Sequence, residues 1–165
     1  MTSMEARFGD ATRTVPLPNP WNLTAYLAAV ATHRGRSISL HPVPTTLLAE
    51  TGCGIGGLWV ARKHDDIIVY DADATGRRAD HIILHEIGHM LLDHGKDGGT
   101  GGSVPPSVAV ILPSISPHSI ERVLGRDEFD ADHEREAEVF ADMTLVYATL
   151  PRRRRRSFRW FRRRK

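Results

Sequence analysis

Residues 85–94, HEIGHMLLDH, constrain the fold most strongly, because they set two histidines four positions apart within an apolar stretch. The surrounding residues 79–93 have the periodicity of an amphipathic helix, with Gly95 just past its end. Side chains four residues apart lie on the same face of a helix, so the rings of His85 and His89 converge. The apolar stripe that buries this helix consists of Ile82, Ile83, Ile87, Met90 and Leu91.

A metal ion accounts for this pair better than an ordinary helix face does. His85 and His89 can fill two corners of a tetrahedral zinc site, each ring nitrogen about 2.0–2.1 Å from the ion. Glu86 projects to one side, where its carboxylate can reach a water at the metal and act as a general base. Burying these three side chains without partners would cost several kcal/mol, and a metal removes that cost.

A catalytic zinc ion needs a third protein ligand. His94 does not fit the extended HExxHxxGxxH spacing, which requires glycine at position 92 and histidine at position 95, where this chain has Leu92 and Gly95. Asp93 lies eight residues after His85 and so returns to the same helix face. Its short side chain suits it to orienting a ligand rather than to binding the metal.

A glutamate from a second helix is the expected third ligand. Residues 127–147 predict a long helix beginning near position 130, with seven acidic residues between positions 127 and 138. Its segment EREAEVFA, at 134–141, offers Glu134, Glu136 and Glu138. A solvated acidic face is the ordinary interpretation of such a helix, but only one or two of these side chains need point inward.

HEIGHMLLDH followed by EREAEVFA resembles the ImmA/IrrE-type (DUF955) metallopeptidases, whose pattern is HExGH and a later helix reading ExxANxFA. Four positions match that helix, and the likeness covers roughly residues 21–147; the matching residues are Glu134, Ala137, Phe140 and Ala141. The resemblance implies a gluzincin-like Zn²⁺ site with Glu134 as third ligand. It also implies a helix-turn-helix transcriptional repressor as the protein substrate.

The chain departs from the family pattern in two places. Glu138 stands where the family commonly has Asn or Asp, and LVYATLP replaces the usual Leu-Leu-x-Pro ending. Glu138 is expected to orient a ligand histidine by contacting the ring nitrogen that does not bind the metal. It is alternatively the third ligand itself, oriented by Asp142 four residues on.

The rest of the chain predicts an α+β fold. Short strands at 37–43, 58–62 and 66–70, the last two a hairpin, form a small antiparallel sheet packed against the HExxH helix and the second ligand-bearing helix. A further helix is expected at 21–34, a flexible turn at 51–57 and an exposed loop at 95–107. We expect a flexible N-terminal arm at 1–20, a metallopeptidase domain at 21–150 and a basic disordered tail at 151–165.

The charge of this chain is unevenly distributed. Ten of the 22 basic residues lie in 152–165, so the remaining 12 face 20 acidic residues and the body carries about −8. Nucleic-acid contact, folding back onto the acidic body and no role at all are equally compatible with the tail. The single cysteine and the absence of a long apolar run predict a cytoplasmic protein without a transmembrane segment.

These observations favour a cytosolic zinc endopeptidase. The alternative is a non-catalytic metal-binding regulator or toxin–antitoxin component that acts by binding a partner or nucleic acid. Glu86 argues against this alternative, since a structural metal site needs no base.

Overall fold

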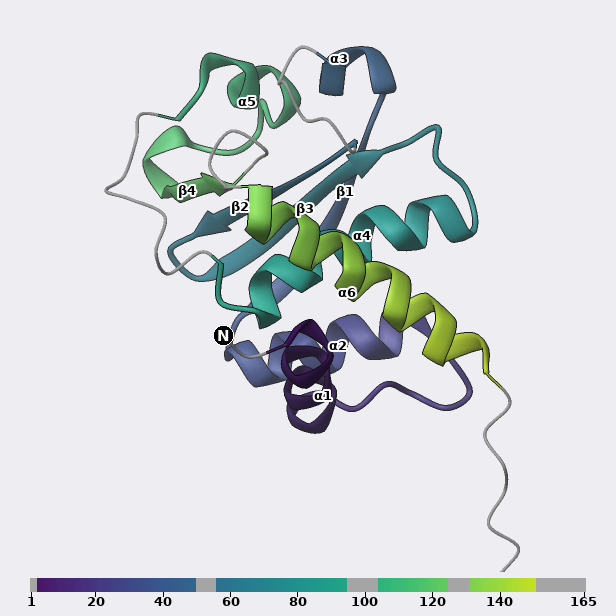
Figure 1. Ribbon diagram of the computed structural model, residues 1–165. Coiled ribbons are helices and arrows are strands. Elements are labelled where there is room, and N and C mark those ends of the chain that lie inside the picture. The colour runs from purple at the N-terminus through teal and green to yellow at the C-terminus, as the bar shows by residue number, and fades with distance from the viewer. Residues whose placement is uncertain (1–2, 50–55, 95–103, 125–130, 151–165) are drawn as a thin grey trace, which may run out of the picture.

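The computed structural model describes residues 3–49, 56–94, 104–124 and 131–150. Its helices and strands are α1 (Met4–Thr14), α2 (Leu23–Arg34), β1 (Ser37–Val43), α3 (Thr45–Ala49), β2 (Gly57–Arg62), β3 (Asp65–Asp71), α4 (Arg77–Leu91), α5 (Pro106–Ile111), a 3₁₀ turn η1 (Pro117–Ser119), β4 (Ile120–Leu124) and α6 (Ala131–Thr149). The four strands form one sheet with helices on both of its faces (Figure 1). This confirms the predicted α+β class.

The sheet is mixed and not antiparallel as predicted. Its order is β1-β3-β2-β4, and β1 runs parallel to β3, from Ser37 beside Asp65 to Val43 beside Asp71. The predicted hairpin of β2 and β3 is confirmed, and β4 adds an unpredicted antiparallel edge strand beside β2. The alternation of side chains in one strand reveals which face it buries but not the direction of its neighbour.

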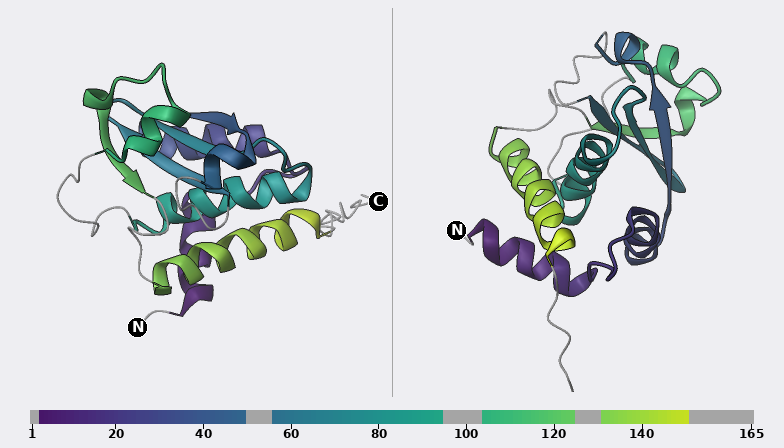
Figure 2. Two further views of the ribbon diagram at one scale, coloured as in Figure 1. Left: turned by 90° about the horizontal axis from the view of Figure 1, so that it is seen from above. Right: turned by 90° about the vertical axis from the view of Figure 1, so that its right-hand side faces the viewer.

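Each face of the sheet has its own core. On one face, Trp59, Ala61 and Ile68 pack with residues of α1, α2, α4 and α6. On the other face, Val60 and Val69 pack with the short helices α3 and α5. Figure 2 shows α4 and α6 together on one side of the sheet and α3 and α5 on the opposite side. The helix with the histidine pair therefore lies between the sheet and α6.

Two glycines shape this helix layer. Gly35 ends α2 in the left-handed conformation, at φ 66°, which glycine adopts without strain. Gly88 faces α6, where a Cβ would lie 3.2 Å from the Cα of Ala137 and 3.2 Å from Cδ1 of Phe140. A small residue on each helix lets the two backbones approach closely, which brings the carboxylates of α6 within reach of the histidines of α4.

The prediction of an arm over residues 1–20 is wrong, because residues 4–14 form helix α1. Ser3 caps this helix by accepting a hydrogen bond from the backbone N–H of Ala6 at 3.3 Å. Phe8 is buried, and its ring centroid lies 5.5 Å from that of Phe140 and 5.5 Å from that of Tyr147. This helix therefore belongs to the same core as α4 and α6.

Other predictions fall partly or wholly on residues that the structure does not describe. The tail at 151–165 lies outside the described residues, and so do most of the turn at 51–57 and most of the loop at 95–107. The described end of that loop already contains the start of α5 at Pro106. No helix among the described residues is long and apolar enough to span a membrane.

Candidate metal centre

Histidines of α4 face carboxylates of α6 along one shared seam. Three histidines follow one another at intervals of four on α4, and three carboxylates do the same on α6; they are His81, His85, His89, Glu134, Glu138 and Asp142. Since side chains four apart share a helix face, each helix presents one row. His89 meets Glu134 at one end and His81 meets Asp142 at the other, so the helices run antiparallel.

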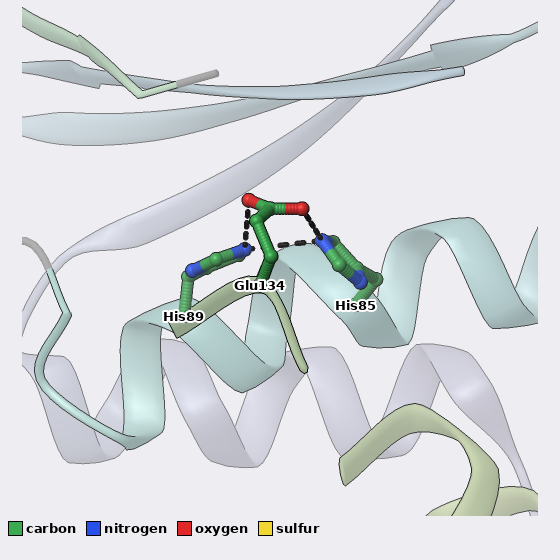
Figure 3. Close-up of side chains that lie close together, drawn as sticks. All are labelled: His85, His89 and Glu134. Atoms are coloured by element: carbon green, nitrogen blue, oxygen red, sulfur yellow. Dashed lines mark hydrogen bonds and ion pairs between the residues drawn. The ribbon is translucent and has the colours of Figure 1, made fainter. Parts of the chain in front are cut away.

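Glu134 lies between the predicted ligand pair (Figure 3). Its Oε2 is 3.5 Å from Nε2 of His85, and its Oε1 is 3.4 Å from Nε2 of His89. The two Nε2 atoms are 3.0 Å apart. His85 and His89 are 2% and 1% exposed, so water cannot replace these contacts easily. The structure thus brings together the three predicted ligands, with their ligand atoms within 4.8 Å of one another.

This arrangement fits a tetrahedral cation. Ligand atoms about 2.0–2.1 Å from a tetrahedral ion lie about 3.3 Å apart. The two Nε2 atoms are 3.0 Å apart, and each histidine Nε2 lies 3.4 or 3.5 Å from a different oxygen of Glu134, so both carboxylate oxygens face the ligand pair at suitable distances. Two imidazole nitrogens that point at each other also need a proton or a cation between them. One carboxylate and two imidazoles are a donor set that suits zinc.

The electrostatics of the triangle favour an anionic carboxylate. Burial opposes ionisation of Glu134, but its contacts with His85 and His89 outweigh that effect and hold its pKa at about 2. Burial also opposes the charged form of His85, yet Glu134 and the negative charges of Glu86 and Glu138 raise the pKa of His85. For His89, burial prevails and its pKa is lowered.

Glu138 lies on the opposite side of His85 from Glu134. Its Oε2 is 3.4 Å from Nδ1 of His85, whereas Glu134 faces Nε2. Neither Nδ1 of His85 nor Oε2 of Glu138 has a hydrogen-bond partner among the described residues. The geometry therefore favours Glu134 over Glu138 as the third ligand, and it leaves Glu138 placed to orient His85.

His89 is held from behind by a hydrogen-bonded chain that sequence reasoning missed. Nδ1 of His89 lies 3.0 Å from Nδ1 of His94, and Nε2 of His94 lies 2.9 Å from Oε2 of Glu136. Arg7 of α1 forms an ion pair with Glu136 and donates a hydrogen bond to the carbonyl of Leu92 at 2.8 Å. The chain thus connects His89 to the N-terminal helix.

The proton positions in this series of hydrogen bonds suit His89 as a metal ligand. Burial lowers the pKa of His94 to about 4, so its ring is neutral at pH 7. Because Glu136 accepts from Nε2–H of His94, the Nδ1 of His94 is left to accept from Nδ1–H of His89. That tautomer turns the lone pair on Nε2 of His89 toward His85 and Glu134.

The orienting role of Asp93 stays a prediction, but the helix position from which it was argued is wrong. This placement required α4 to continue past position 93, but α4 ends at Leu91. Asp93 has a left-handed backbone, at φ 61°, and an exposed side chain that lines a surface cavity with Arg34 and Arg36. His94 takes the predicted orienting place, because the turn after the helix brings its ring back against His89.

Glu86 is 4% exposed and packs against the first residue of β2. A Cβ at Gly57 would lie 2.8 Å from Oε1 of Glu86 and 2.8 Å from Cγ2 of Ile82, so only glycine leaves room for this carboxylate. Burial raises the pKa of Glu86 to about 7, and the charge of Glu134 adds to the effect. A carboxylate with this pKa can take up and release a proton near neutral pH.

Comparison of this chain with protein-family models, curated proteins and solved structures found no match. The functional assignment therefore rests on the site and on the motifs that form it.

Proposed function

We propose that this protein is a zinc-dependent endopeptidase. The observation that carries the proposal is the joint placement of two imidazoles and one carboxylate in a ligand triangle, with a second, buried carboxylate adjacent to the first histidine in sequence. His85, His89 and Glu134 would hold the ion, and Glu86 would act as the base. When bound, zinc would lower the pKa of a water molecule and polarise the carbonyl of a peptide bond.

Glu86 performs the proton transfers in this scheme. Its carboxylate accepts a proton from the attacking water and later donates it to the nitrogen of the departing amine. The space left by the absence of a side chain at Gly57 accommodates the carboxylate, and burial keeps its pKa near the pH at which such a group works best. His94 and Glu138 orient the two ligand rings.

The substrate class is proposed from the motif resemblance. HEIGHMLLDH and EREAEVFA resemble the repressor-cleaving metallopeptidases, so a helix-turn-helix repressor is the proposed substrate. The lone Cys53 suits a reducing compartment, which supports a cytosolic setting. A non-catalytic regulator remains the competing function, and a buried base beside the metal ligands disfavours it.

Two variants of the full chain separate these functions. Glu86→Gln is expected to keep the tightly bound zinc and to lose about 10²–10⁴-fold in peptidase activity, because only the base is removed. Glu134→Gln is expected to lose the tightly bound zinc as well, because the anionic ligand is lost. Elemental analysis gives the zinc content, and mass spectrometry of cleaved repressors and a degenerate peptide library gives the activity. Cleavage that survives Glu86→Gln unchanged would contradict the mechanism.

A further inference from the structure

The seam of histidines and carboxylates continues one helical turn beyond the ligand triangle. Nε2 of His81 lies 3.1 Å from Oδ1 of Asp142 and 3.6 Å from Oε1 of Glu138. The ligand atoms of these three side chains all lie within 4.8 Å of one another. This second group has one imidazole from α4 and two carboxylates from α6, whereas the first has two imidazoles and one carboxylate.

We propose that His81, Glu138 and Asp142 form a second binding site for a divalent transition-metal cation, weaker than the first. Imidazole nitrogen suits zinc and its neighbours, and carboxylate oxygen adds affinity for manganese. Spacing by four residues places Glu138 and Asp142 on the same face of α6. The site would therefore need no rearrangement of either helix backbone.

The hydrogen bonding of these residues leaves room for a cation. The Nε2 atom of His81 can donate only one hydrogen, yet it faces two carboxylate oxygens. Only Oε1 of Glu138 faces His81, since its Oε2 lies 3.4 Å from Nδ1 of His85. A divalent ion would offset the repulsion between the two carboxylates, which a single imidazole proton cannot do fully.

Exposure distinguishes the second site from the first. The side chains of His81, Glu138 and Asp142 are 22%, 45% and 67% exposed, whereas His85 and His89 are buried. Solvent reaches the second site and screens its charges, so it should bind an ion more weakly and exchange it faster. Open coordination positions would be filled by water.

Glu138 connects the two sites. Its Oε1 faces His81 and its Oε2 faces Nδ1 of His85. An ion held by Oε1 would fix the rotamer of Glu138 and thereby the position of the oxygen that orients His85. This coupling rests on the proposed zinc centre, whereas ion binding at the second site does not.

Metal titration tests the proposal. The untagged full chain, stripped with a chelator, is dialysed against increasing Zn²⁺, and bound zinc is counted by elemental analysis. We expect one tight equivalent and one equivalent that binds at least about tenfold more weakly. Asp142→Asn and His81→Gln should each remove the weak equivalent and keep the tight one. Asp132→Asn makes the same Asp-to-Asn change at an exposed position of α6 and should leave both equivalents intact.

Two results would overturn the proposal: a single equivalent in the unaltered chain, or a weak equivalent that persists in both variants. Either result would show that the three side chains form only an interhelical ion pair. Glu134→Gln separates this outcome from failure of the peptidase proposal. It should abolish the tight equivalent and leave the weak one, whether or not the protein cleaves peptides.

Discussion

The two ligand histidines are supported in opposite ways. Behind His89, the chain through His94, Glu136 and Arg7 has hydrogen bonds of 3.0 and 2.9 Å and ends in an ion pair with α1. Behind His85, Glu138 is the one side chain that the described residues place near Nδ1, 3.4 Å away and half exposed. One imidazole is therefore held rigidly by three segments of the chain, and the other rests against a side chain that can move.

This difference indicates which ligand histidine contributes more to metal affinity and which one responds more to its neighbours. A ring fixed before the ion arrives loses little freedom on binding, so the His89 side should supply most of the preorganisation. The orientation of the His85 ring should depend on what Glu138 contacts.

Removing the hydrogen bonds behind His89 should have the larger effect on zinc affinity. His94→Phe keeps a ring of similar shape but removes both hydrogen bonds, so zinc affinity should fall about 10–100-fold. The measurement is competition with a fluorescent zinc chelator, compared with the melting temperature of the zinc-free protein. His33→Phe removes an exposed histidine from α2 and is the matched control, which should leave the affinity unchanged. A loss of melting temperature without a loss of affinity would mean that His94 only supports the fold.

Removing the charge of Glu138 behind His85 should have the smaller effect on zinc affinity. Glu138→Gln keeps an oxygen near Nδ1 of His85 but removes the charge, so the tight equivalent should weaken by less than about tenfold. The same variant should lose the weak equivalent, because it removes a ligand of the second site. Asp142→Asn should lose the weak equivalent alone. If Glu138→Gln weakened the tight equivalent more than His94→Phe does, the group behind His85 would contribute more to zinc affinity than the groups behind His89, contrary to this account.

Much of this centre is local in sequence and was predictable for that reason. The apolar period of residues 79–93 and the spacing of His85 and His89 depend on one helix, and α4 follows both closely. Glu134 required a second helix and the resemblance of its motif to a known pattern. Gly88 gives the physical reason why the two helices meet, since a Cβ there would contact the backbone of Ala137.

The parts that could not be predicted depend on contacts between distant segments. Arg7 and Glu136 are 129 residues apart, and nothing in the sequence around Arg7 signals that contact. Helix α1 has a narrow apolar stripe of Met4, Phe8 and Ala11 at helical spacing, and this signal was missed because the rest of its sequence is polar. Asp93 was misplaced because the end of α4 came two residues before it, and helix ends are the least certain part of a prediction.

Anomalous diffraction at the zinc absorption edge, from crystals of the full chain grown with one equivalent of zinc, tests the central claim most directly. The claim predicts one strong peak between Nε2 of His85, Nε2 of His89 and the carboxylate of Glu134. A peak elsewhere, or an ion bound by the two histidines while Glu134 points away, would contradict it.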